Sequence, residues 1–162
     1  MYGRLCGGLP GLSIPAPCTL SLVTTKIRVR YAETDQMGVA YYANYFIWCE
    51  VGRVELLRQL GFEYRQMEID HRLFLPVVEA SCRYRSPARY DEEVLIETRV
   101  SGLRASVIKF AYRLLCRRAG EDEPVLLAEA ETVHVVVDQE MKKCPLPEPY
   151  FSAIRATLDA DA

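Results

Sequence analysis

The sequence predicts one α+β domain in which an antiparallel sheet of five strands curves around a single long helix. The chain has 162 residues, 50% of them hydrophobic, which suits one domain with a sizeable core. Apolar residues recur at helical spacings of three and four in one long segment, residues 44–60. One strand-like run precedes this segment and four follow it. Because short connections favour antiparallel neighbours, the strands are expected to form one sheet whose concave face holds the helix.

The first strand is predicted to begin at Lys26, because apolar and basic residues alternate from there to Tyr31. Residues 1–25 show neither a helical nor a strand period. Their prolines interrupt the continuous apolar stretch that a secretory signal requires. We therefore interpret residues 1–25 as a flexible N-terminal extension.

The long helix is predicted over residues 44–60, and both of its ends carry signals. Asn44 is the expected N-cap, Arg58 suits the negative end of the helix dipole, and Gly61 suits the left-handed residue that follows a helix. Apolar side chains cover most of the circumference, so the helix is expected to be largely buried. Residues 62–70 are predicted to form a second short helix or a turn.

Turn residues separate four further strand-like runs. The predicted strands are residues 75–85, 92–100, 104–117 and 125–138. The folded domain is predicted to span residues 26–150. Residues 151–162 are expected to form a C-terminal tail or a short helix.

Composition excludes several classes of function. A net charge of −2 argues against a protein that tracks nucleic-acid phosphates, because such proteins are usually basic. No uninterrupted apolar run reaches the length of about 18 residues that a membrane-spanning helix needs. The six cysteines are scattered, without metal-ligand spacing. We therefore expect reduced, mostly buried thiols in a cytoplasmic protein without a membrane span.

Residues 31–45 read YAETDQMGVAYYANY and contain the pattern YxxTDxxGVxYxxNY. This pattern resembles the signature of the 4-hydroxybenzoyl-CoA thioesterase-like branch of the hotdog-fold acyl-CoA thioesterases. The similarity extends over residues 26–150. Outside the motif, the similar positions are Glu50 and Arg53 in the helix, SPARYDE at residues 86–92, Arg104 with Ser106, and Asp138 in the last strand.

The resemblance implies the hotdog fold and assembly into a homodimer or homotetramer. It also implies hydrolysis of the thioesters of coenzyme A without a metal or organic cofactor. Thioesters of acyl carrier protein are a further substrate class that the branch leaves open, as is the choice among aromatic, short-chain and medium-chain acyl groups.

Thioester hydrolysis needs a carboxylate beside the carbonyl carbon and a donor for the oxygen that becomes negative. Asp35 is the candidate carboxylate, and it either attacks directly or deprotonates a water. The donor is expected to be a backbone amide at the N-terminus of the long helix, and the resemblance places it at Tyr42. Many members of the branch have histidine at this position, so its absence here argues against an imidazole acid or base. The alternative interpretation of Asp35 is a turn or helix-entry residue.

The rest of the motif is expected to surround the substrate. The positions are Gly38, Val39, Tyr41, Asn44 and Tyr45. Gly38 allows close approach of the backbone. The tyrosines at positions 31, 41 and 45 are expected to act as wall and packing residues rather than as proton donors.

Four residues outside the motif have two interpretations each. Arg104 and Ser106, together with Lys109, either hold the phosphates of coenzyme A or belong to a solvated strand face. Glu50 is either a second catalytic carboxylate or a structural residue that forms an ion pair with Arg53.

Two other functions fit the same fold. A hotdog dehydratase pairs its acid with a nearby histidine, but no histidine lies between Lys26 and Asp70. A non-catalytic module that binds acyl-CoA or acyl carrier protein would retain the pocket. Release of free thiol separates the enzyme from the module.

Overall fold

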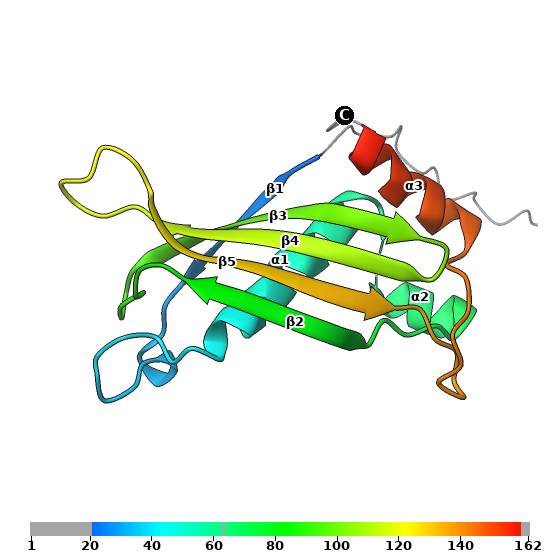
Figure 1. The fold of residues 1–162 in the computed structure, drawn as a ribbon, viewed down its shortest axis with the longest axis horizontal. Coiled ribbons are helices and arrows are strands. Elements are labelled where there is room, and N and C mark those ends of the chain that lie inside the picture. The colour runs from blue at the N-terminus through cyan, green and yellow to red at the C-terminus, as the bar shows by residue number, and fades with distance from the viewer. Residues whose placement is uncertain (1–20, 63, 160–162) are drawn as a thin grey trace, which may run out of the picture.

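The computed structural model describes residues 21–62 and 64–159 and has the predicted α+β architecture (Figure 1). The elements are β1 (Val23–Arg28), the 3-10 helix η1 (Tyr31–Glu33), α1 (Asn44–Gln59), α2 (Tyr64–His71), β2 (Val77–Tyr84), β3 (Glu93–Arg104), β4 (Val107–Cys116), β5 (Val125–Val135) and α3 (Glu148–Asp159). The short helix expected after α1 is therefore present. The C-terminal helix begins at Glu148, slightly before its predicted start.

The five strands form one antiparallel sheet in the order β1-β3-β4-β5-β2. Helix α1 crosses its concave side and packs mainly against β3 and β1. Strands β3 and β4 present alternate residues to this side, as the period of two predicts. The buried positions are Val94, Ile96, Thr98 and Val100 on β3, and Ile108, Phe110, Tyr112 and Leu114 on β4.

Two glycines have specific roles in α1, one where it packs on the sheet and one at its end. A Cβ atom on Gly52 would lie 2.4 Å from the Thr98 Oγ1 atom and 2.8 Å from the Ile96 Cγ2 atom, so only glycine permits this close approach to β3. At the end of the helix, Gly61 has a φ of +84° and donates its amide to the Arg58 carbonyl at 3.0 Å. The predicted left-handed residue after the helix is confirmed.

Two predictions about α1 are wrong. Asn44 is not an N-cap, because its side chain donates to the Glu33 carbonyl at 2.8 Å, and α1 has no side-chain cap. The helix is also less buried than expected, since Ile47 is 51% exposed and Val51 41% exposed. These residues belong to a side of α1 that the sheet of its own chain does not cover.

The first strand is offset from its predicted position. β1 begins at Val23 and ends at Arg28, and Tyr31 opens η1 instead of continuing the strand. The sheet therefore includes the last residues of the segment that was predicted to be a flexible extension. Residues 1–20 of that segment lie outside the described residues.

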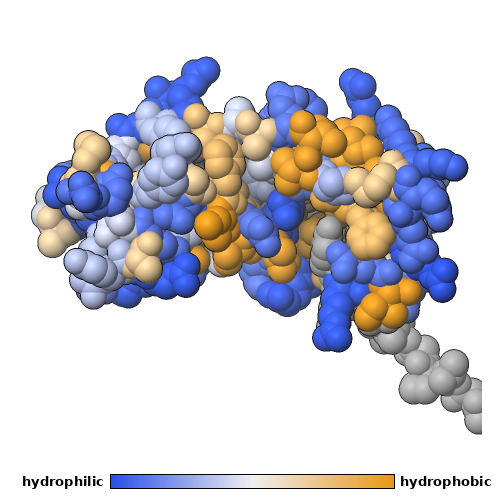
Figure 2. All heavy atoms as spheres, turned by 90° about the horizontal axis from the view of Figure 1, so that it is seen from below, coloured by the Kyte–Doolittle hydropathy of each residue, from blue (hydrophilic) through white to orange (hydrophobic). Residues whose placement is uncertain are grey.

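Strand β2 is an uncovered edge of the sheet. It pairs with β5 on one side, and seven of its eight residues are exposed on both faces, with Cys82 intermediate. Figure 2 shows the molecule from the side on which β2 lies. Apolar side chains gather across the middle of this face. Large apolar residues exposed on β2 and α1 include Val77, Val78, Tyr84, Ile47 and Val51.

Within the described residues, no helix is long and apolar enough to cross a membrane. No cluster of three or more histidine, cysteine, aspartate or glutamate residues suited to a metal ion occurs in the same part of the chain. Cys49 and Cys116 are buried free thiols, and Cys82 and Cys144 are half-buried free thiols. Cys6 and Cys18 lie outside the described residues.

Candidate functional site

A cleft of about 310 Å³ opens where the loop after η1 meets the end of β2 and the turn that follows it. We call it the Asp35 cleft. Its lining residues are Asp35, Val39, Ala40, Tyr42, Tyr45, Tyr84, Arg85, Ser86 and Pro87. The volume lies at the lower end of the range of small-ligand pockets.

The loop that carries Asp35 folds back on itself. The Asp35 amide donates to the Val39 carbonyl at 2.9 Å, and the Gly38 amide donates to the Asp35 carbonyl at 3.0 Å. Gly38 has a φ of +72°, a conformation that favours glycine. The Asp35 Oδ1 atom accepts a 2.8 Å hydrogen bond from the Met37 amide, while Oδ2 accepts none from the described residues. Asp35 thus makes the turn contact that the structural interpretation predicts, through only one of its two carboxylate oxygens.

Amide donors are available at the N-terminus of α1. Within the described chain, the amides of Tyr42 and Ala43 donate to no backbone or side-chain acceptor. The Tyr41 carbonyl accepts from the Asn44 amide at 3.0 Å. Because N–H and C=O point in opposite directions across a trans peptide, this bond fixes the direction of the Tyr42 N–H. The helix dipole adds partial positive charge at this end.

Two cleft tyrosines act as neutral hydrogen-bonding groups. The Tyr84 hydroxyl donates to the Tyr42 carbonyl at 3.0 Å, and the Tyr45 hydroxyl accepts from the Ala88 amide at 3.1 Å. Burial raises the pKa of both tyrosines, and Cys82 raises the pKa of Tyr84 further. Both phenols therefore stay protonated near neutral pH, and each holds the backbone beside the cleft.

The buried carboxylate of Glu33 anchors the loop from behind. It accepts hydrogen bonds from the Arg30 amide at 2.7 Å, the Arg30 Nη2 atom at 2.9 Å and the Trp48 Nε1 atom at 3.2 Å. Burial alone raises the pKa of Glu33, but these hydrogen bonds outweigh burial and hold its pKa below the usual range. The backbone carbonyl of Glu33 accepts from the Tyr41 amide at 2.8 Å, so this residue ties the Asp35 loop to α1.

The turn at residues 86–92 forms the opposite wall. Its Ala88 carbonyl accepts from the Ala40 amide at 2.8 Å. Arg118, at the end of β4, supports the turn by donating to the Pro87 carbonyl at 2.6 Å, the Ser86 Oγ atom at 3.3 Å and the Glu92 carboxylate at 2.9 Å. Two segments far apart in the sequence are thereby fixed on either side of the cleft.

Four of the predicted motif positions line the cleft: Asp35, Val39, Tyr42 and Tyr45. Tyr45 is 2% exposed and has the predicted packing role, whereas Tyr31 and Tyr41 are exposed, contrary to prediction. Gly38, Tyr41 and Asn44 support the loop or flank it without lining the cleft.

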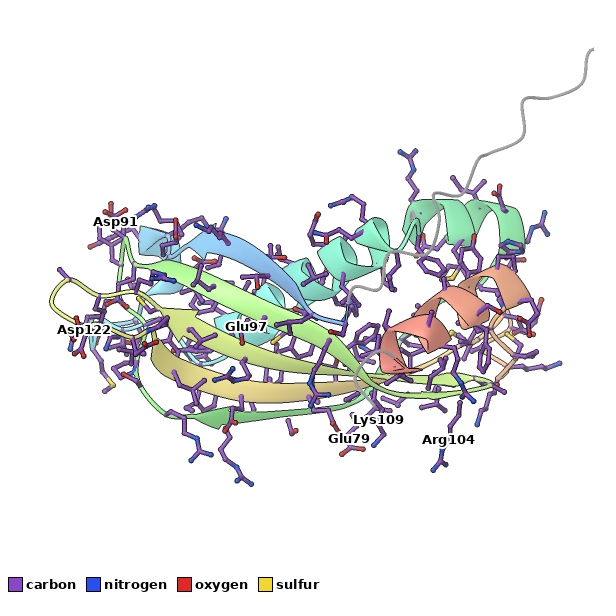
Figure 3. All side chains as sticks on the ribbon, turned by 90° about the horizontal axis from the view of Figure 1, so that it is seen from above. Glu79, Asp91, Glu97, Arg104, Lys109 and Asp122 are labelled. Carbon is purple, nitrogen blue, oxygen red and sulfur yellow. The ribbon has the colours of Figure 1, made fainter. Side chains whose placement is uncertain are left out.

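The predicted positions outside the motif do not meet in the cleft of one chain. Glu50 is exposed on α1, and the predicted ion pair with Arg53 is absent among the described residues, because Arg53 turns toward His134 instead. Figure 3 shows Arg104 and Lys109 at one end of the sheet and Asp91, next to the cleft-lining turn, at the other. Ser106 lies in the turn that joins β3 to β4, near Arg104.

Sequence reasoning missed five cleft residues: Ala40 within the motif, and Tyr84, Arg85, Ser86 and Pro87 outside it. A signal was present, since SPARYDE at residues 86–92 belongs to the similar region. Its location beside Asp35 depends on the pairing of β2 with β5, which the sequence pattern does not specify.

Comparison with known proteins agrees with this geometry. The model of the thioesterase-like superfamily matches residues 29–154. The putative acyl-CoA thioesterase YneP of Bacillus subtilis (strain 168) is 39% identical over 118 residues, which cover 73% of this chain and 81% of YneP. The acyl-CoA thioester hydrolase YbgC of Escherichia coli O6:H1 is 33% identical over 123 residues, which cover 75% of this chain and 87% of YbgC.

A solved structure shows the same fold. The 4-hydroxybenzoyl CoA thioesterase from Pseudomonas sp. strain CBS-3 matches with a TM-score of 0.75 and 20% identity, over 82% of this chain and 99% of that chain. The family match, the relatives and the curved sheet around α1 lead to one identification: the chain belongs to the thioesterase-like superfamily and is a hotdog-fold thioesterase.

Proposed function

We propose that the enzyme hydrolyses acyl-CoA thioesters to the free acid and coenzyme A, with Asp35 as the reacting carboxylate and the Tyr42 amide as the oxyanion donor. The proposal rests on one observation: Asp35 and Tyr42 line the same cleft. Neither the Asp35 Oδ2 atom nor the Tyr42 amide has a hydrogen-bond partner among the described residues. The printed names of YneP and YbgC support the substrate class.

The chemistry follows from these two groups. Asp35 either attacks the thioester carbon, giving a mixed anhydride that water then hydrolyses, or removes a proton from an attacking water. In both routes the carbonyl oxygen becomes negative, and the Tyr42 amide stabilises it at a helix N-terminus. Coenzyme A leaves as the thiol after the C–S bond breaks.

The catalytic unit is proposed to be at least a homodimer. Strand β2 exposes an unpaired edge and both faces, an arrangement that proteins commonly cover by pairing with another chain. Arg104 lies toward the end of the sheet opposite Asp91 (Figure 3), which belongs to the turn at residues 86–92 beside the cleft, and Ser106 lies in the turn that follows Arg104. Pairing of two antiparallel β2 strands brings that end of one chain toward the cleft of the other, where the two residues are positioned to bind the phosphates of coenzyme A.

The test is a free-thiol release assay with a panel of aromatic, short-chain and medium-chain acyl-CoAs, and with one acyl group presented on acyl carrier protein. Turnover of at least one acyl-CoA is expected, and the panel ranks the acyl groups. Tight binding of acyl-CoA without thiol release would instead identify a non-catalytic binding module.

A further inference from the structure

Arg53 is a half-buried cation without a carboxylate partner among the described residues. Its Nη1 atom lies 3.2 Å from the His134 Nε2 atom, and its Nε atom is buried with no hydrogen-bond partner there. His134 supplies no negative charge. Burial is the main cause that lowers its pKa to about 4, so the ring is neutral near pH 7.

The hydrogen bonds of His134 leave little capacity for further stabilisation of the guanidinium. Its Nδ1 atom lies 3.1 Å from the Leu75 carbonyl and its Nε2 atom 3.0 Å from the Thr132 Oγ1 atom. Thr132 in turn contacts the Tyr112 hydroxyl at 2.9 Å. These groups are all neutral. A partly desolvated cation among neutral groups is costly unless an anion pairs with it.

Glu50 is an anion on the same helix that lacks a partner in the described part of the chain. It lies three residues before Arg53 and is exposed, on the side of α1 that includes the exposed residues Ile47 and Val51. The two charges do not meet within one chain, because Arg53 turns toward the sheet. Helix α1 therefore has an exposed anion about one turn from a half-buried cation, and neither has a partner of opposite charge among the described residues. Two such helices packed antiparallel offer each cation the anion of the other.

The register of the sheet sets the level of α1 relative to the uncovered edge strand β2. Gly52 lies against Thr98, and Thr98, Tyr112, Ala130 and Cys82 are successive register partners across β3, β4, β5 and β2. The middle of α1 is therefore level with Cys82, the sixth of the eight residues of β2. Two copies paired antiparallel along β2 hold their α1 helices antiparallel on the same side of one joined sheet, and the side of each helix that its own sheet leaves exposed is free to meet the other.

We propose that Glu50 of each chain pairs with Arg53 of the other across this two-fold interface. This inference rests on the proposed homodimer and adds the ion pairs that specify it. By symmetry both pairs form at once, and the exposed apolar residues Ile47 and Val51 are buried around them.

Charge reversal with mixing of chains tests the pairing. E50R and R53E are each expected to weaken the dimer about tenfold or more, because each homodimer then opposes like charges. In an equimolar mixture, the E50R chain has two arginines and the R53E chain two glutamates at these positions. Native mass spectrometry is expected to show the mixed dimer as the dominant species. A pair within one chain cannot be restored by mixing, so this readout is specific to the interface.

Two further variants separate a loss of the interface from a loss of folding. E50Q changes an exposed residue and is expected to weaken the dimer while the circular dichroism spectrum stays unchanged. E97R is the matched control. Glu97 pairs with Arg113 at 3.0 Å, and its neighbours Ile96 and Thr98 face α1, so Glu97 lies on the other face of the sheet. E97R is expected to leave the dimer intact.

Three outcomes would overturn the proposal. The first is a monomeric wild-type enzyme, the second is an E50Q dimer as tight as wild type, and the third is a mixture in which folded E50R and R53E chains do not form the mixed dimer. Thiol release by the wild-type enzyme is measured separately. A negative result for the ion pair can therefore be distinguished from a negative result for the proposed hydrolysis.

Discussion

His134 gives the stability of the enzyme a specific pH dependence. An unfolded histidine takes up a proton near pH 6.5, whereas burial lowers the folded pKa of His134 to about 4. The unfolded chain therefore binds more protons between these values, and the unfolding free energy falls as pH decreases from about 6.5 to about 4. The slope of the unfolding free energy against pH is proportional to the number of protons taken up on unfolding. H134Q is expected to lower this number by up to one between about pH 4 and pH 6.5.

The measurement is chemical denaturation of wild type and H134Q at several pH values. H71Q is the control, because His71 is exposed and lies outside the buried network, and it is expected to retain the wild-type slope. Equal slopes for wild type and H134Q would show that His134 titrates alike in the folded and unfolded chains.

At the residue scale, local patterns predicted some of the site and missed what depends on distant contacts. Asp35, Val39, Tyr42 and Tyr45 line the cleft as the motif implied. The anchoring role of Glu33 was not predicted, because its partner Trp48 lies 15 residues later and meets it only when α1 packs behind the loop. Asn44 was assigned as a cap from residue type alone. Its side chain instead donates to the Glu33 carbonyl at 2.8 Å, a contact that depends on how the loop folds against α1.

At the scale of elements, the turn at residues 86–92 depends on Arg118, which lies two residues beyond the end of β4. R118Q removes the hydrogen bonds to the Ser86 Oγ atom and the Pro87 carbonyl, both on cleft-lining residues. We expect kcat/KM for acyl-CoA to fall about tenfold, because the wall that positions the substrate loosens.

The matched control for R118Q is R113Q. Arg113 is an arginine of β4 that likewise pairs with a glutamate, but its partner Glu97 on β3 does not line the Asp35 cleft. R113Q is expected to keep kcat/KM within about twofold of wild type, since an exposed ion pair contributes little. Equal losses in the two variants would mean that Arg118 acts on general stability and not on the cleft.

Periodicity predicted the type and order of the elements better than their limits and exposure. The strands and α1 were found because periods of two and of three to four persist along them. β1 was misplaced because its first residues, Val23 to Thr25, continue no clear alternation of charge. The exposure of Ile47 and Val51 could not be predicted from the sequence, since an apolar residue on an exposed side of a helix has the same residue type and spacing as a core residue.

At the scale of the whole molecule, catalysis is assigned to groups that need no metal. Thiol release is therefore expected to survive exhaustive dialysis against EDTA, because backbone amides and a carboxylate are not removed by chelation. Activity is measured before dialysis, after it, and after addition of a divalent ion. A loss that the ion restores, and that refolding alone does not, would contradict the amide-based mechanism.

The most direct measurement of the central claim is the rate of thiol release by D35N with the best acyl-CoA of the panel. The amide preserves the size of the side chain and an oxygen acceptor for the Met37 amide, so the fold and the dimer are expected to be retained. Loss of the reacting carboxylate is expected to lower kcat about a thousandfold or more. A folded D35N enzyme with kcat near that of wild type would contradict the account and make Glu50 the next carboxylate to test.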